Sequence, residues 1–187
     1  MEQLNISPND IDIVVLSHIH GDHTGGLSGI LETNPNVSVY IPSSFPDSFK
    51  QEVREKGAQP IDVSNEKQIY KNVYSTGELN SSIGLKEQSL FINTNRGIVV
   101  LTGCAHPGIV NIVKHIKEMS KNSICLVIGG FHLGSASESQ LNEIINEFKT
   151  LEVEKAAPCH CSGDRARQLF KETYRENFIE NGVGKII

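Results

Sequence analysis

Three histidines and one aspartate lie within six residues near the start of the chain: His18, His20, Asp22 and His23. They directly follow the apolar run Ile11–Leu16, whose length and β-branched content predict a strand. Neutral imidazoles and carboxylates are the ligands that borderline divalent cations prefer. A strand that ends in such a cluster therefore indicates a metal site, and the density of the motif argues against a chance surface cluster.

The spacing of these four side chains favours two ions. In an extended segment, residues two apart point the same way, so His18 and His20 can converge on one ion. Gly21 permits a bend, and Asp22 and His23 on that bend can serve a second ion beside the first. Two ions about 3.5–4 Å apart can hold and ionise a bridging water.

The stretch His18–His23, continued by Thr24–Leu27, resembles the metal motif of the metallo-β-lactamase superfamily. Three later stretches are similar to the branch that includes the archaeal dihydropterin–ribofuranosylaminobenzene phosphate synthase: Leu101–Gly108, Gly129–Leu133 and Ala157–Gly163. The resemblance covers most of the chain. It implies a mixed α/β fold, the metallo-β-lactamase-like αββα sandwich, formed by one domain over residues 1–187.

The second half of the chain repeats a pattern of strand, site residue and helix. His106, His132 and His160 each lie just past a predicted strand. Sites assemble at the carboxyl ends of strands in layered α/β proteins, so we expect these residues to converge on the first motif. The predicted strands are 97–101, 124–128 and 153–157, and the helices that follow them are 107–119, 137–148 and 162–175.

The remaining elements are predicted from periodicity and turn residues. They are helices over 26–32 and from Ser44 or Asp47 to Lys56, strands over 37–41, 61–63, 69–74, 89–94 and 183–187, and a polar loop over 76–84.

The resemblance implies two sets of metal ligands, holding one or two divalent ions. Zinc is expected first, with iron, manganese or nickel as alternatives, because all accept these ligands. The first set is His18, His20 and His106, and the second is Asp22, His23 and His160.

One feature of the family is missing from this chain. The resemblance implies a bridging aspartate between His106 and His160, but the corresponding place, Gly129–His132, has no carboxylate. His132 then has two possible roles, as a ligand or catalytic group, or as a substrate contact. Without the bridging carboxylate, the second ion is expected to bind weakly or to be absent.

A phosphate-binding group is predicted where the last helix begins. Ser162 and Arg165 lie next to His160, and the free N–H groups of a helix N-terminus attract anions. The alternative is an ordinary helix cap with surface charges. Cys159 and Cys161 flank His160 as possible soft ligands, but buried small hydrophobic side chains are the favoured interpretation for both.

Cys104 is interpreted in the same way, as a small buried side chain.

The predicted chemistry is metal-assisted. A bound ion lowers the pKa of its water toward about 7, so that a metal-bound hydroxide forms at neutral pH, and Asp22 can orient it or accept its proton. We expect a metal-dependent hydrolase, or a related metal-assisted transferase, acting on a small phosphorylated or ester substrate. Two alternatives stay open: a pterin-condensing synthase-like enzyme and a non-catalytic metal-binding protein.

The composition limits the partners. The chain has 187 residues, 38% of them hydrophobic and 21% charged, as in ordinary globular domains. A net charge of −5 gives no basic footprint for nucleic acid or an anionic membrane. No apolar run approaches the roughly 20 residues of a membrane span, and no signal peptide is visible. Four cysteines do not indicate a disulfide scaffold, so a cytoplasmic location is expected.

The N-terminus is short for the family that the motifs resemble. Ten residues precede the first predicted strand, whereas the family carries several strands before its histidine motif. The predicted sandwich therefore lacks its N-terminal strands and leaves a strand edge or face uncovered, which is a pairing hazard. We expect a homodimer or another homo-oligomer to cover it.

Overall fold

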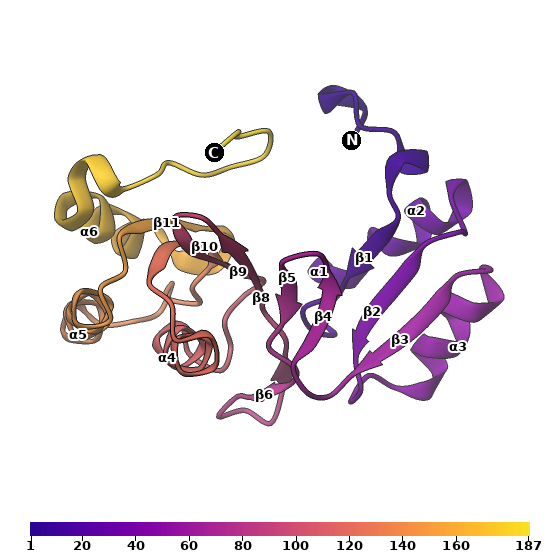
Figure 1. Ribbon diagram of the computed structural model, residues 1–187, viewed down its shortest axis with the longest axis horizontal. Coiled ribbons are helices and arrows are strands. Elements are labelled where there is room, and N and C mark those ends of the chain that lie inside the picture. The colour runs from indigo at the N-terminus through magenta and orange to yellow at the C-terminus, as the bar shows by residue number, and fades with distance from the viewer.

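A three-stranded parallel sheet carries the first half of the chain. The structure, a computed structural model, describes residues 1–187 apart from the side chain of Glu2. The strands are β1 (Ile13–Val15), β2 (Ser38–Pro42) and β3 (Gln59–Val63), in the order β1-β2-β3. The helices α2 (Leu27–Thr33) and α3 (Asp47–Glu55) cover one face of this sheet (Figure 1).

A six-stranded sheet carries the second half, in the order β11-β10-β9-β8-β5-β4. Three helices cover its outer face (Figure 1). The strands are β4 (Lys67–Tyr70), β5 (Val73–Ser75), β8 (Leu90–Thr94), β9 (Gly97–Thr102), β10 (Ile124–Gly130) and β11 (Lys155–Cys159). The helices are α4 (Ile109–Ser120), α5 (Glu138–Thr150) and α6 (Asp164–Tyr174).

The order of the layers is helix, sheet, sheet, helix, so the predicted αββα architecture is confirmed (Figure 1). Each sheet has its own hydrophobic cluster against its helices. In the smaller cluster Val39 and Ile41 of β2 pack with Leu31 of α2 and Val53 of α3. In the larger one Phe131, Phe148 and Phe170 form an aromatic group with ring centroids 5.3–5.7 Å apart.

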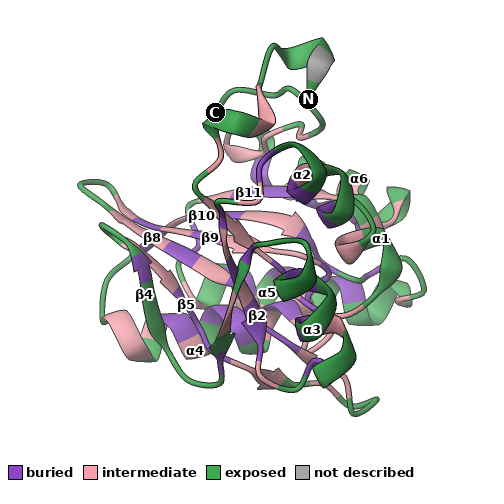
Figure 2. Cartoon of the chain, turned by 90° about the vertical axis from the view of Figure 1, so that its right-hand side faces the viewer, coloured by how far each residue is buried: buried purple, intermediate pink, exposed green. Residues whose placement is uncertain are grey.

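The faces that the two sheets turn toward each other are less buried than the helix-covered faces. Along β9, Ile98 and Val100 are fully buried, while Val99 and Leu101 are only half-buried. This alternation gives the strand two different faces (Figure 2). Gln88 joins the sheets, because its side-chain amide donates to the Leu16 carbonyl at 2.8 Å and its backbone N–H donates to the Ser17 carbonyl at 2.9 Å.

The strand register brings three chain segments to one edge. Strands β9, β10 and β11 run parallel, with Thr102 opposite Gly129 and Gly130 opposite Cys159. Their carboxyl ends therefore lie side by side, as the repeated pattern predicted. The loop after β1 meets the same edge, where it becomes the four-residue helix α1 (Gly21–Thr24).

Several predicted boundaries are wrong. Residues 69–74 are not one strand, because Asn72 adopts a left-handed conformation with φ of 64° and turns the chain between β4 and β5. The predicted loop 76–84 contains β6 (Leu79–Asn80), which pairs with β7 (Lys86–Glu87).

The predicted closing strand over 183–187 is also wrong. No strand forms there, and Val183 and Ile186 are 98% and 92% exposed, because the segment has no strand beside it to pair with among the described residues. The last helix begins at Asp164 and not at 162. Within the described part of the chain, no helix is long and apolar enough to cross a membrane.

Candidate metal centre

The first group of imidazoles forms where β1 ends and meets the end of β9. His18 is fully buried, and its Nε2 lies 3.1 Å from Nδ1 of His20. The His106 ring lies 4.6 Å from that of His18 and 5.0 Å from that of His20, measured between centroids. The structure therefore brings together the three residues predicted as the first ligand set, although they come from two different sheets.

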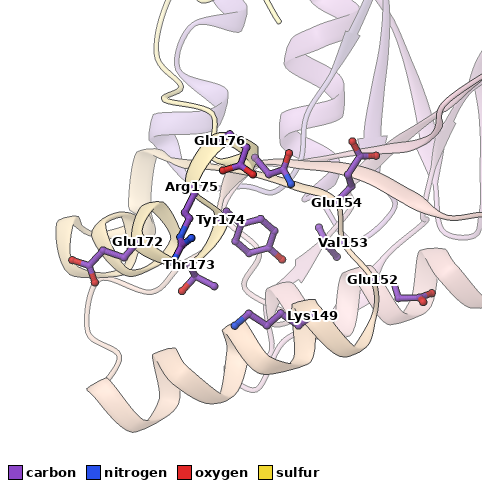
Figure 3. Close-up of a pocket in the computed structure, with 10 residues that line it drawn as sticks. Lys149, Glu152, Val153, Glu154, Glu172, Thr173, Tyr174, Arg175 and Glu176 are labelled. Carbon is purple, nitrogen blue, oxygen red and sulfur yellow. The ribbon is translucent and has the colours of Figure 1, made fainter.

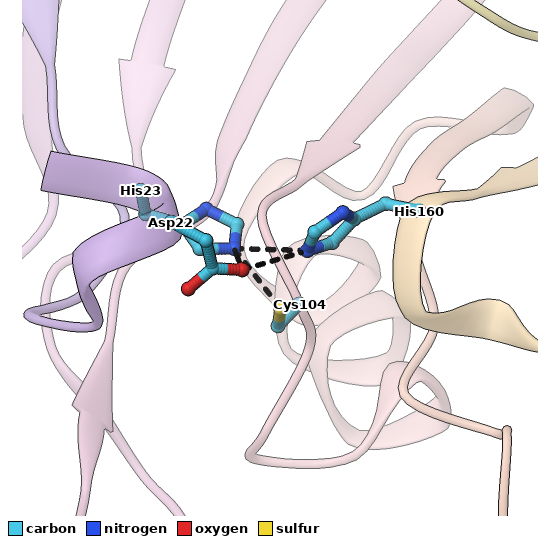
Figure 4. Close-up of side chains that lie close together, drawn as sticks. All are labelled: Asp22, His23, Cys104 and His160. Carbon is cyan, nitrogen blue, oxygen red and sulfur yellow. Dashed lines mark hydrogen bonds and ion pairs between the residues drawn. The ribbon is translucent and has the colours of Figure 1, made fainter. Parts of the chain in front are cut away.

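The second group forms beside the first and joins α1 to the end of β11. Nε2 of His23 lies 3.1 Å from Nε2 of His160, and Oδ2 of Asp22 lies 3.3 and 3.2 Å from these two atoms. Figure 4 shows these three side chains pointing toward one another, with Cys104 beneath them. Sγ of Cys104 lies 3.1 Å from Nε2 of His23. The three residues predicted as the second set thus meet, with a thiol that was predicted only as a small hydrophobic side chain.

The distances within the second group fit a metal ion. Four ligands held at bond lengths of about 2.0–2.3 Å in a tetrahedron lie roughly 3.3–3.8 Å from one another. The ligand atoms of Asp22, His23, Cys104 and His160 all lie within 4.8 Å of one another. Nitrogen, oxygen and sulfur donors of this kind are those that zinc accepts. The side chains present therefore fit a divalent ion without any rearrangement of the backbone.

A buried glutamate that the sequence analysis missed supports the site. The Glu87 carboxylate is fully enclosed and accepts backbone N–H bonds from Cys104, Ala105 and His106, each at 2.9 Å. Its Oε2 also lies 2.8 Å from Nδ1 of His106. When that nitrogen donates to Glu87, Nε2 of His106 keeps its lone pair for a metal.

The electrostatics keep the imidazoles in the form that binds a metal. Burial lowers the pKa of His18 to about 4, although the Glu87 carboxylate acts in the opposite direction. Burial also lowers the pKa of His23, against the opposing effect of Asp22. Desolvation acts to raise the pKa of Asp22, but its own backbone N–H and the nearby imidazoles outweigh it and hold that pKa below its usual value. The lowered pKa values of His18 and His23 favour the neutral imidazoles that metals bind, and the lowered pKa of Asp22 favours its carboxylate.

Comparison with known proteins decides the family. The family model described as the metallo-beta-lactamase superfamily matches residues 1–160. This chain belongs to the metallo-beta-lactamase superfamily. It is 32% identical to the 7,8-dihydropterin-6-methyl-4-(beta-D-ribofuranosyl)-aminobenzene-5'-phosphate synthase of Methanocaldococcus jannaschii, over all of this chain and 78% of the relative.

Solved structures agree with this family. A crystal structure of a metal-dependent hydrolase of the beta-lactamase superfamily superimposes with a TM-score of 0.81 and 27% identity, over 98% of this chain and 81% of that one. The isothiocyanate hydrolase from Delia radicum gut bacteria shares the fold with a TM-score of 0.64 at 11% identity, over 97% of this chain and 78% of that one.

His132 lies beside the first group of predicted ligands. It follows β10, its ring centroid lies 4.4 Å from that of His106, and its side chain is exposed. It also lies with Cys104 and Cys161 in a third group whose possible ligand atoms are within 4.8 Å of one another. Both roles predicted for His132, ligand and substrate contact, are compatible with this position.

Three residues at the same edge have a rare backbone conformation. Ala105, His132 and His160 adopt left-handed conformations with φ of 63°, 54° and 52°. Residues other than glycine rarely occupy this region, and such strain gathers at functional sites. His160 directly follows β11, whereas His132 and Ala105 lie two and three residues past the ends of β10 and β9.

The predicted phosphate-binding residues have protein partners instead. Ser162 is fully buried; its Oγ donates to the Cys159 carbonyl at 2.6 Å and accepts the Phe131 N–H at 3.1 Å. Arg165 is paired with Glu138, with a distance of 2.9 Å from its Nε to Oε2. Arg165 is thus part of an exposed ion pair, as in the alternative interpretation, whereas Ser162 joins the ends of β10 and β11 and does not cap α6, whose N-cap is Gly163.

Two pockets lie at opposite ends of the second sheet. A pocket of about 520 Å³ borders the metal centre at His106 and His132. Another, of about 720 Å³, lies at the far end of β11 between the last turns of α5 and α6, where Tyr174 and Lys149 line it (Figure 3). Burial raises the pKa of Tyr174 to about 12. Of these two pockets the first adjoins the histidines, and a smaller cavity of about 240 Å³ is also lined by His23.

Proposed function

We propose that this chain is a metal-dependent enzyme that binds one or two divalent ions, with zinc first, and hydrolyses a small molecule or transfers a group from it. The observation that carries the proposal is the meeting of seven donor side chains from β1, β9 and β11 at one sheet edge. Its members are His18, His20, Asp22, His23, Cys104, His106 and His160. Bound ions would supply Lewis acidity and an ionised water at neutral pH.

The residues of the centre would have three roles: metal ligand, proton acceptor and substrate contact. His18, His20 and His106 would hold the first ion, and His23 and His160 with Asp22 would hold the second. The Asp22 side chain is 58% exposed, so one of its oxygens can face solvent and accept a proton while the other faces the imidazoles. His132, at the border between the histidines and the pocket, is placed to contact the substrate.

The pocket of about 520 Å³ is where the substrate would lie. Pockets of this size accommodate small organic molecules. Its walls combine apolar side chains with polar groups that include Asn111, Gln140 and the acidic Glu143, and its described lining includes no Lys or Arg. A phosphate group would therefore need the metal ions as its cationic partners, whereas an ester or ring system would pack on the pocket wall.

A second candidate activity is condensation of a pterin with an aromatic amine derivative. The similarity to the Methanocaldococcus jannaschii synthase, over the whole of this chain, favours it. The apolar and amide-rich lining of the pocket is also suited to a flat heterocycle. A non-catalytic metal-binding protein remains the third alternative. We further propose a reducing, cytoplasmic setting, because all four cysteines are free.

One experiment separates these candidates. Metal content is measured on the purified protein, and turnover is then measured on a panel of phosphodiesters, carboxylic esters and a dihydropterin with its amine partner. We expect metal and turnover in the native chain and loss of both in His106→Ala. The matched control His115→Ala, on the helix α4, should change neither. Bound metal without turnover on the full panel would favour the non-catalytic alternative.

A further inference from the structure

We propose that the thiolate of Cys104 is the ligand shared between the two metal positions, in the role that the missing bridging aspartate has in the family. This inference rests on the proposed metal centre and concerns which atom joins its two halves. The established similarities assign no role to Cys104.

The position of Cys104 is the first argument. Three groups of side chains have ligand atoms close enough for one ion, and Cys104 belongs to all three. One group contains Asp22, His23 and His160, and another contains His18 and His106. The ligand atoms of His18, Cys104 and His106 also lie within 4.8 Å of one another. A ligand shared by both ions must lie within bonding reach of both sets of histidines. Among the described residues, no carboxylate belongs to both groups.

The way in which Cys104 is held is the second argument. Its side chain and backbone are 5% exposed, and its backbone N–H donates to Glu87 at 2.9 Å. Gly130 of the neighbouring strand lies so close that a Cβ there would stand 3.1 Å from Cα of Cys104. The backbone of Cys104 is thus held from two sides, and its Sγ lies 3.1 Å from Nε2 of His23.

Charge is the third argument. Imidazole binds a metal as a neutral ligand, so Asp22 would be the one anionic side chain of the predicted ligand sets that faces two divalent ions. The Glu87 carboxylate is already satisfied by three backbone N–H groups and His106. When metal binds, the Cys104 thiol would release its proton to solvent and form one bond to each ion. Thiolate is a soft ligand, so such a site favours zinc, iron(II) and cobalt(II) over manganese and magnesium.

Cys161 is the competing thiol. It lies with Cys104 and His132 in the third group, but it is absent from the two groups that contain the other histidines. Its Sγ lies 3.6 Å from the Cys104 carbonyl. Its place is therefore beside the bridging position, between Cys104 and His132, rather than between the two ions.

Cobalt(II) titration of the metal-free chain tests this inference. Thiolate bound to cobalt(II) gives an intense near-ultraviolet charge-transfer band, whereas imidazole and carboxylate ligands give only weak visible bands. We expect the intense band in the native chain and in Cys125→Ser, whose cysteine lies in β10 with its Sγ 3.2 Å from the Ile98 carbonyl. In Cys104→Ser the band should be lost, and bound metal should fall from about two equivalents to about one.

A second variant guards against a folding defect. Cys104→Asp restores a bridging carboxylate, so it should bind about two equivalents again while showing no charge-transfer band. Loss of the band in Cys161→Ser with its retention in Cys104→Ser would overturn the inference in favour of the other thiol. Binding of cobalt without any charge-transfer band in the native chain would overturn it while leaving the proposed metal centre intact. Failure to bind cobalt at all would refute the metal centre as well.

Discussion

At the scale of single residues, Glu87 determines how firmly the metal centre is held. It has no contact with solvent and binds three consecutive backbone N–H groups together with the His106 ring. Burial acts to raise the pKa of Glu87, but these donors outweigh it and hold that pKa below its usual value. The carboxylate is therefore charged at pH 7 and fixes both the loop and the tautomer of His106.

Glu87→Gln should weaken metal binding and stability together. The amide keeps one acceptor oxygen and presents donors to N–H groups, so at least one buried N–H loses its partner. We expect metal affinity to fall about 10–100-fold and the free energy of unfolding to fall by about 1–3 kcal/mol. Metal titration and urea unfolding measure the two effects. Glu118→Gln, on the exposed face of α4, is the matched control, and equal behaviour of the two variants would contradict this role.

The residues of the centre differ in how far the sequence could predict them. The histidines and Asp22 were predicted because they are dense in sequence or follow apolar strands. Glu87 could not be found in this way, since it lies in a short polar strand 19 residues before its partner His106. Cys104 was predicted to be buried, which is correct, but its contact with His23 depends on the packing of two sheets.

At the scale of elements, Gly130 lets three strand ends come together. A Cβ at this position would stand 2.8 Å from Sγ of Cys161 and would press on the Gly103 carbonyl. Gly130→Ala therefore overpacks the junction of β9, β10 and β11. We expect it to lower the free energy of unfolding by about 1–3 kcal/mol, measured by urea unfolding. In Gly29→Ala, within α2, a Cβ meets nothing within 4 Å, so stability should stay the same or rise.

Glu78 ties the small β6–β7 hairpin to the first sheet. It accepts the Ser44 N–H at 2.6 Å and the Lys86 ammonium at 2.9 Å. Burial acts to raise the pKa of Glu78, but these two donors outweigh it, and the pKa in the folded chain lies below its usual value. The stability that Glu78 contributes is therefore present above the pKa of the unfolded chain, about 4.5, and is lost as the pH falls through the folded value.

The Glu78→Gln variant should show this pH dependence. At pH 7 we expect it to be less stable than the native chain by about 1.5–3 kcal/mol, the range for hydrogen bonds to a charged group. The difference should shrink when urea unfolding is repeated below the folded pKa of Glu78. Glu66→Gln, at an exposed position on the preceding turn, is the control and should match the native chain at both pH values. A difference that stays constant with pH would contradict the prediction.

The elements around the centre were predictable where local signals are strong. Apolar runs ending in glycine or histidine identified β9, β10 and β11, and the helical stripes identified α4, α5 and α6. The turn at Asn72 was missed because it splits a run that alternates only weakly. The absence of a strand over 183–187 was also missed, because apolar residues form a strand only where another strand has a free edge beside them.

At the scale of the whole molecule, the two sheets leave apolar surface between and beside them. Val15, Leu90 and Leu101, from both sheets, are half-buried and line a cavity of about 240 Å³. The larger sheet ends at β4, where Tyr70 is 68% exposed. An open edge with an exposed aromatic side chain is a template for pairing with another chain. These features support the proposal of a homo-oligomer in which a second chain covers this edge.

We therefore expect the chain to be a dimer in solution that pairs through β4. Light scattering coupled to size exclusion should give a mass of about 41 kDa, twice the 20.5 kDa of one chain. Tyr70→Asp should shift the mass toward 20.5 kDa, because it places a charge in the paired edge. Ile83→Asp is the matched control, since Ile83 is similarly exposed, at 71%, but lies outside β4. A native chain that elutes as a clean monomer, or a dimer that both variants leave unchanged, would show that this edge is not the contact.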